Sequence, residues 1–158
     1  TQRRRIVSDY DKELEAPVRI LIASDGSKGA AHAVDVVAAR HWPPDSQVRL
    51  VNATWTVPPV AATHMVAPIA SWINDENSRI SEAMKEATGK LAKAGLSVTS
   101  IVAEEEPKTL ICREAELWGA DCIFVGARGM GTVERFMIGS ISSGVAARAH
   151  CSVEVVRP

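Results

Sequence analysis

The sequence predicts an α/β fold: a doubly wound sheet of five parallel strands with helices on both faces. Two observations lead to this fold class. Short apolar segments alternate along the 158 residues with segments of helical periodicity, which is the pattern of repeated β-α units. The apolar segments are also continuous rather than alternating with polar residues, as in Ile20-Leu21-Ile22, and strands buried on both faces have this character.

Composition restricts the class of protein. The length fits one domain, and we expect residues 1–16 to be a flexible tail and residues 17–158 to be the folded part. With a net charge of -1, the chain offers no strongly basic surface for nucleic acid or an anionic membrane. We find neither a signal peptide nor an apolar stretch of the roughly 20 residues that span a membrane. An odd number of cysteines, without a C-x-x-C pair, indicates buried free thiols in a reducing cytoplasm.

The first strand, Val18 to Ala23, ends in Ser24-Asp25-Gly26-Ser27. Ser27 is a good N-cap for a helix at 28–40. Asp25 therefore lies at the carboxyl end of a central strand, where ligands of open α/β sheets bind. Asp-Gly is also a common turn pair, so a purely turn-stabilising Asp25 is the alternative.

The middle of the chain continues the alternation. We expect a strand at 47–53, a loop at 54–70, a helix at 71–94, a strand at 97–103 and a helix at 108–118. The loop contains three prolines and is either a lid over the strand ends or a surface excursion. Glu104-Glu105-Glu106 before the next helix indicates a solvated helix N-terminus rather than a metal site.

The last third contains the pattern that organises the chain. A strand at Cys122–Val125 ends at Gly126, glycine recurs at 129, 131 and 139, and a helix at 140–149 and a strand at 153–156 follow. A strand that leads into a glycine-rich loop and a helix start is suited to holding phosphate, because backbone N–H groups and the helix dipole attract the anion. The chain has no G-x-x-x-x-G-K-[ST], and a loop that only needs turn residues is the alternative.

The spacing of these glycines resembles a known family. Two residues separate Gly126 from Gly129, and nine residues separate Gly129 from Gly139-Ser140. This spacing is similar to the G-2x-G-9x-G-[ST] signature of universal stress proteins of the ATP-binding type. The Asp25-Gly26-Ser27 turn also matches the family, and the resemblance covers about residues 17–158. It implies a Rossmann-like fold of the adenine nucleotide α-hydrolase type, with strand order 3-2-1-4-5.

The resemblance also implies a binding site for ATP, with Mg²⁺ bridging the phosphates. Adenine would lie near Ala23, Ala53 and Val125, and the ribose near Asp25 and Gly126, beside Ser24. The phosphates would meet a set of glycines and helix-start residues: Gly129, Gly139, Ser140, Ile141 and Ser142. Arg128 either neutralises phosphate charge or is simply exposed. The chain has Asn52-Ala53 where many relatives have His-Val, and Ala53 offers adenine less apolar surface.

Three functions are compatible with this pattern. The chain shows no lysine or base placed for phosphoryl transfer, so an ATP-binding regulatory module that acts through loop or dimer changes is the first interpretation. A slow ATP-hydrolysing or nucleotidyl-transferring enzyme and an interaction module without nucleotide are the alternatives. The apolar last strand at 153–156 would form a sheet edge, which predicts a homodimer through this strand, as the resemblance also implies.

Overall fold

The computed structural model describes residues 16–54, 66–128 and 138–157, and its elements follow the predicted alternation. In chain order they are β1 (Arg19–Ala23), α2 (Lys28–Ala39), β2 (Gln47–Thr54), α3 (Val66–Lys93), β3 (Ser97–Glu104), α4 (Pro107–Trp118), β4 (Cys122–Gly126), α5 (Ser140–Arg148) and β5 (Ser152–Val156). Residues 1–15 of the predicted tail lie outside the described residues.

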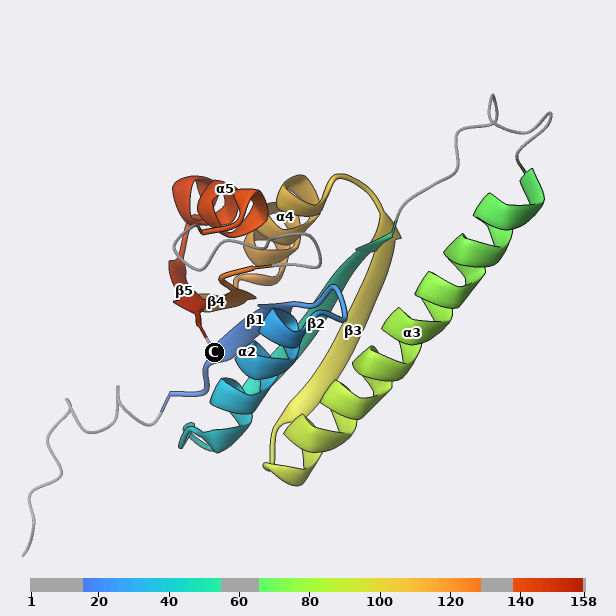
Figure 1. The fold of residues 1–158 in the computed structure, drawn as a ribbon. Helices are drawn as coiled ribbons and strands as arrows, with labels where there is room; N and C mark the ends of the chain where they lie inside the picture. Colours follow the sequence, from blue (N-terminus) through green and yellow to red (C-terminus); the bar gives the residue numbers. More distant parts are fainter. Residues whose placement is uncertain (1–15, 55–65, 129–137, 158) are drawn as a thin grey trace, which may run out of the picture.

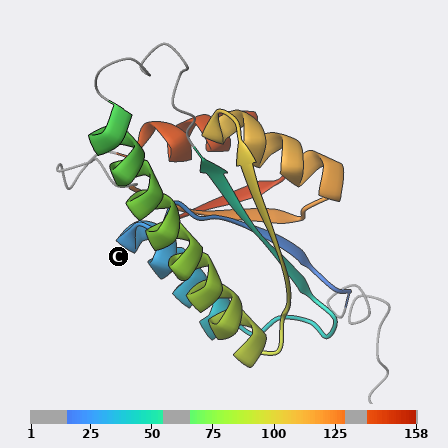
Figure 2. The same ribbon diagram turned by 90° about the vertical axis from the view of Figure 1, so that its right-hand side faces the viewer.

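The five strands form one parallel sheet in the order β3-β2-β1-β4-β5, which confirms the predicted topology. Helices α2 and α3 cover one face, and α4 and α5 cover the other (Figures 1 and 2). From β1 the chain winds outward to β3 and then returns to β4 on the other side of β1. The carboxyl ends of β1 and β4 therefore meet at the point where the winding reverses, and a crevice opens there.

Each face of the sheet has its own apolar core. Ile20 and Ile22 of β1 pack under α2 and α3, whereas Leu21 between them packs under α4 and α5. All three side chains are fully buried. This explains why the strand is continuously apolar, because successive side chains point to opposite faces and both faces are covered by helices.

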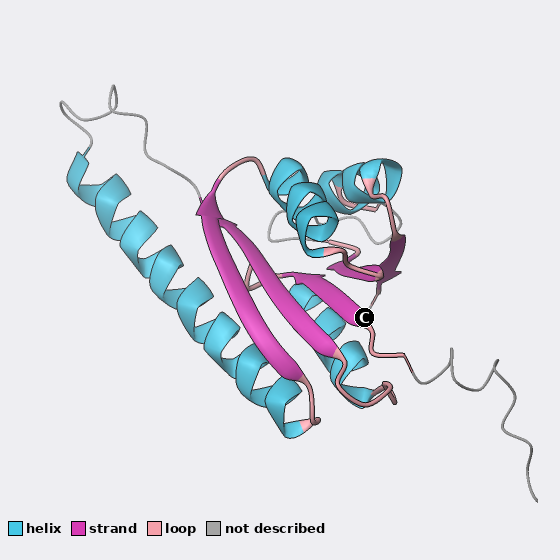
Figure 3. Cartoon of the chain, turned by 180° about the vertical axis from the view of Figure 1, so that it is seen from behind, coloured by secondary structure: helices cyan, strands magenta, loops and turns pink. Residues whose placement is uncertain are grey.

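Helix α3 departs from the sequence prediction. It begins at Val66 rather than near Ser71, so the last part of the loop predicted at 54–70, residues 66–70, is helical. The prediction was wrong because it treated Pro68 as a loop residue. Pro68 lies in the first turn of α3, where a missing N–H breaks no helical hydrogen bond. Residues 55–65, the central part of the predicted loop, lie outside the described residues, so the choice between a lid and a surface excursion stays open. As Figure 3 shows, the amino-terminal part of α3 extends beyond the carboxyl ends of the neighbouring strands.

Glu106, the last residue of the acidic run, caps α4. The carboxylate of Glu106 accepts hydrogen bonds from the Thr109 N–H at 2.9 Å and the Thr109 hydroxyl at 2.8 Å. These bonds stabilise the ionised form and lower the pKa of Glu106. Within residues 16–54, 66–128 and 138–157, no group of three or more acidic, histidine or cysteine side chains is placed to hold a metal ion. None of the helices in these ranges is long and apolar enough to cross a membrane.

The three cysteines, Cys112, Cys122 and Cys151, are partly rather than fully buried. Burial is still sufficient to disfavour the thiolate, and it raises the pKa of Cys122 to about 11. The thiols are thus poor nucleophiles near neutral pH, in keeping with a packing role.

The end of β4 approaches the start of α2 very closely. A Cβ built on Gly126 would lie 2.5 Å from the carbonyl carbon of Gly29 and 2.9 Å from the Ala30 nitrogen. A Cβ on Gly29 would lie 2.4 Å from the carbonyl oxygen of Arg128. Glycine is required at both positions because the two backbones touch, and this contact closes one side of the crevice.

We predict that Gly126→Ala destabilises the protein by about 1–3 kcal/mol, because the added methyl group can enter only if the backbone moves. Unfolding in urea, with linear extrapolation to water, measures the change. The control is Gly89→Ala in α3, where a Cβ meets nothing within 4 Å. This control should stabilise the protein by about 0.5–1 kcal/mol through helix propensity. Equal effects of the two substitutions would contradict the packing argument.

Candidate functional site

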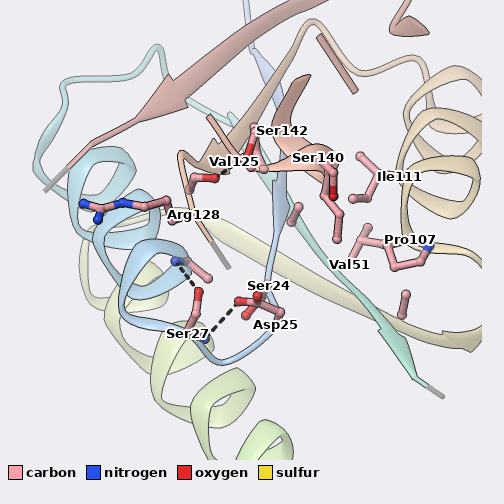
Figure 4. A pocket seen from close by; sticks show the side chains of 16 residues that line it. Ser24, Asp25, Ser27, Val51, Pro107, Ile111, Val125, Arg128, Ser140 and Ser142 are labelled. Carbon is pink, nitrogen blue, oxygen red and sulfur yellow. Dashed lines mark hydrogen bonds between the residues drawn. The ribbon is translucent and has the colours of Figure 1, made fainter. Parts of the chain in front are cut away.

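A cavity of about 480 Å³ occupies the crevice at the carboxyl ends of β1, β2 and β4 (Figure 4). Every site residue predicted from the sequence lines it, apart from Gly129, which lies outside the described residues. These residues are Ala23, Ser24, Asp25, Ala53, Val125, Gly126, Arg128, Gly139, Ser140, Ile141 and Ser142. The fold thus brings together the Asp25 turn and the glycine-rich segment, which are about a hundred residues apart in the sequence.

Five further residues complete the lining: Ser27, Ala30, Val51, Pro107 and Ile111. The sequence analysis missed them, although two signals were present. Val51 is two positions before Ala53 on the same strand, so strand alternation places both on one face. Pro107 and Ile111 belong to α4, which starts directly after β3 and therefore at the same end of the sheet.

The lining is divided between apolar and polar sides. Figure 4 shows Val51, Pro107 and Ile111 on the side of α4, and Ser24, Asp25 and Ser27 at the turn before α2. The first three side chains offer apolar surface to a ligand, whereas the turn offers oxygen atoms to hydroxyl donors. Cavities of this size and mixed lining are typical of small-molecule sites.

Asp25 fulfils the turn-stabilising role that the sequence left open. Its Oδ1 accepts a hydrogen bond from the Ser27 N–H at 2.9 Å, and Ser27 Oγ accepts one from the Ala30 N–H at 3.2 Å. Gly26 between them has a φ of 71°, which favours glycine. In the part of the chain that the structure describes, Oδ2 of Asp25 accepts no hydrogen bond. One carboxylate oxygen thus fixes the turn, and the other is available to a ligand.

The start of α5 differs from the starts of α2 and α4. Ser27 caps α2 and Glu106 caps α4 with side-chain oxygens, but the N-cap of α5 is Gly139, which has no side chain. The Gly139 N–H itself donates to the carbonyl of Ala127 at 2.8 Å. No side chain of the described residues accepts from the first-turn N–H groups of α5, at 140–142. Free N–H groups and the positive end of a helix dipole are suited to attracting an anion, and here they lie beside the cavity.

Two residues predicted to contact the phosphates, Ser142 and Arg128, have side chains directed elsewhere in the structure. The hydroxyl of Ser142, whose residue is only 2% exposed, donates to the carbonyl of Gly126 at 2.7 Å. Its proton is therefore used to join α5 to β4 rather than offered to a ligand. The guanidinium of Arg128 points away from the other labelled side chains of the cavity in Figure 4, although the residue is half-buried rather than exposed. Ser140, by contrast, is exposed beside the cavity.

Comparison with known proteins identifies the family. The model of the universal stress protein family matches residues 18–157, nearly the whole chain. The chain belongs to the universal stress protein family. It is 30% identical over 150 residues to universal stress protein YxiE of Bacillus subtilis, and the match covers 88% of this chain and 98% of that protein.

Solved structures of universal stress proteins share the fold. UspA from Lactobacillus plantarum superimposes with a TM-score of 0.71 at 22% identity, covering 90% of this chain and 99% of that one. A family member from Arabidopsis thaliana that has AMP bound reaches a TM-score of 0.64 at 15% identity, covering 89% and 92% of the two chains. A universal stress protein in complex with cAMP reaches 0.57 at 22% identity, covering 89% and 97%.

The two serines at the start of α5 should respond differently to truncation. We predict that Ser142→Ala destabilises the protein by about 1–3 kcal/mol, because the buried Gly126 carbonyl loses its hydrogen bond. Ser140→Ala, at an exposed position, should change stability by less than about 0.5 kcal/mol. Thermal and urea unfolding of the two variants measure this difference, and a Ser140→Ala variant as unstable as Ser142→Ala would refute the division of roles.

Proposed function

We propose that this universal stress protein is a cytoplasmic stress-response module that binds an adenine nucleotide, with ATP as the ligand. The observation that carries the proposal is the uncapped N-terminus of α5, which opens into a cavity that also has an apolar side. Such a site combines an anion-binding element with room for a flat base. The AMP and cAMP complexes of two proteins with the same fold support an adenine nucleotide as the ligand class.

The lining suggests how the nucleotide lies. We place the adenine against Ala23, Ala53 and Val125, with the α4 side chains closing that side, and the ribose beside Oδ2 of Asp25. The phosphates then meet the first-turn N–H groups of α5 and the hydroxyl of Ser140. Asp25 is the acidic residue among the lining side chains, so Mg²⁺ would be held chiefly by phosphate oxygens, as this ion often is.

The same residues favour binding over catalysis. Phosphoryl transfer needs a cationic group directed at the phosphates and a base for the attacking water. The cationic residue in the described lining, Arg128, points away from it. We therefore propose a regulatory output, in which bound ATP changes loop order or dimer contacts. ATP turnover above the spontaneous rate that is lost in Asp25→Ala would favour the enzyme interpretation instead.

A negative charge at the start of α5 should exclude the phosphates. We predict that wild-type protein binds Mg·ATP in isothermal titration calorimetry, and that Ser140→Asp weakens this binding at least tenfold, or by about 1.4 kcal/mol. The carboxylate occupies the dipole position that the phosphates would use. For the same reason it should raise the stability of the free protein by about 0.3–1 kcal/mol, so lost binding would not reflect unfolding.

The control is Ala146→Asp, which adds the same charge at an exposed position of the same helix, roughly 9 Å further along its axis. Its ATP affinity should remain close to that of the wild type. Equal losses in both variants would contradict the placement of the phosphates. No binding of ATP to well-folded wild-type protein would overturn the proposal and favour an interaction module without nucleotide.

We also propose a homodimer through β5. This strand forms one edge of the sheet, and Val153 and Val155 on it are only partly buried within one chain. The Val156 carbonyl accepts a hydrogen bond from Ala127 on the inner side of the strand. Because backbone groups alternate along a strand, those of Val155 face the open edge, where they are available to a second chain.

Proline at position 155 should therefore separate the dimer without breaking the sheet, since proline is tolerated on the outer side of an edge strand. We predict a dimeric mass for the wild type and a monomeric mass for Val155→Pro in sedimentation equilibrium, with unchanged circular dichroism. The control is Val102→Lys, which alters an exposed valine on the opposite edge strand, β3, and should remain dimeric. A monomeric wild type at high concentration would refute this dimer.

A further inference from the structure

We infer that Arg79 of α3 is a positioning residue of the nucleotide site, because its guanidinium holds the Asp25-Gly26 turn in the form that presents Asp25 to the ribose. This inference deepens the proposed function and rests on it. Arg79 does not line the cavity, and the glycine and turn motifs of the sequence do not include it.

The carbonyl groups of the turn have donors from outside the turn itself. Arg79 Nη1 donates to the Gly26 carbonyl at 2.6 Å, and Nη2 donates to the Asp25 carbonyl at 3.3 Å. The preceding carbonyl, of Ser24, accepts from the buried amide of Asn52 at 2.6 Å. Three successive carbonyls are thus held by side chains of α3 and β2, while the Asp25 side chain lines the cavity.

The guanidinium is itself held in place. Glu76, one turn earlier on α3, accepts from Arg79 Nε at 3.1 Å and from Nη2 at 2.6 Å. This paired contact fixes the plane of the guanidinium, which lysine does not have. The pair also lowers the pKa of Glu76, so the carboxylate is ionised at neutral pH.

Two features of the structure favour glycine at position 26. Its φ of 71° lies in the left-handed region, and a Cβ there would come within 3.0 Å of Arg79 Nη1. The guanidinium thus packs directly against the turn. Without it, the Asp25-Gly26 and Gly26-Ser27 peptide groups lose donors on the α3 side. The turn then keeps the Ser27 contact to Asp25 Oδ1 and the Asn52 contact to the Ser24 carbonyl, but its last two carbonyls are less restrained, and we infer that the Asp25 carboxylate is oriented less precisely.

The test compares nucleotides that differ only in the group that Asp25 would bind. Calorimetry measures the affinities of Mg·ATP and of its 2′,3′-dideoxy analogue for the wild type, Arg79→Ala, Arg79→Lys and Glu76→Gln. We expect the wild type to prefer ATP by about tenfold, since a hydrogen bond to an ionised carboxylate is lost with the hydroxyls. Arg79→Ala should reduce this preference to about twofold or less and leave affinity for the dideoxy analogue nearly unchanged.

Two variants separate positioning from simple stabilisation. Arg79→Lys keeps the charge but not the paired donors, so it should show an intermediate preference. Glu76→Gln keeps Arg79 and its two carbonyl contacts, so it should retain most of the wild-type preference even if it is less stable. A merely structural Arg79 would lower the melting temperature while the ratio of the two affinities stayed the same.

The outcomes distinguish this inference from the proposed function. A wild type that binds ATP with the expected preference, together with an Arg79→Ala variant that keeps it, would overturn the role of Arg79 alone. Equal binding of both nucleotides by the wild type would overturn the ribose contact and hence the inference. Absence of nucleotide binding by folded wild-type protein would overturn both.

Discussion

The close contact between Gly126 at the end of β4 and Gly29 at the start of α2 is the constraint on which the site depends. A Cβ at either position would lie within 2.5 Å of a backbone atom of the other segment. This approach brings the turn after β1, the first turn of α2 and the end of β4 to one place. The glycine that a sequence motif associates with phosphate is thus required first by packing of backbone against backbone, and the cavity follows from that packing.

Around this contact, some polar groups make hydrogen bonds within the protein, whereas others make none within the described residues. The starts of α2 and α4 are capped by Ser27 and Glu106, whereas the start of α5 has no cap from a side chain. The same division appears between two neighbouring serines. Ser142 is buried and joins α5 to β4, whereas Ser140 is exposed beside the cavity. An uncapped helix end is tolerated at this exposed position because water or a bound anion can accept from its N–H groups.

Residues from both faces of the sheet also contribute to the site. The cavity opens between α4, α5 and the strand ends, but the turn that carries Asp25 is held from the other side by Arg79 of α3. Asn52 of β2 holds the same turn through its hydrogen bond to the Ser24 carbonyl. A change in the position of α3 would therefore reach the proposed ribose contact through two hydrogen bonds, which is a physical route for the proposed regulatory output.

The sequence by itself determined the order of strands and helices, because burial on both faces makes each strand a continuous apolar run. Together with the family signature it also predicted the sheet order and the two segments that meet at the cavity. It misplaced the start of α3, since Pro68 in a first turn looks the same as proline in a loop. Only the tertiary structure decided that the Ser142 hydroxyl donates to the Gly126 carbonyl and that the Arg128 side chain points away from the cavity. It also showed that Pro107 and Ile111 line the cavity and that Arg79 contacts the Asp25-Gly26 turn. These roles depend on contacts between segments far apart in the chain, and local sequence patterns do not specify which long-range partner a side chain meets.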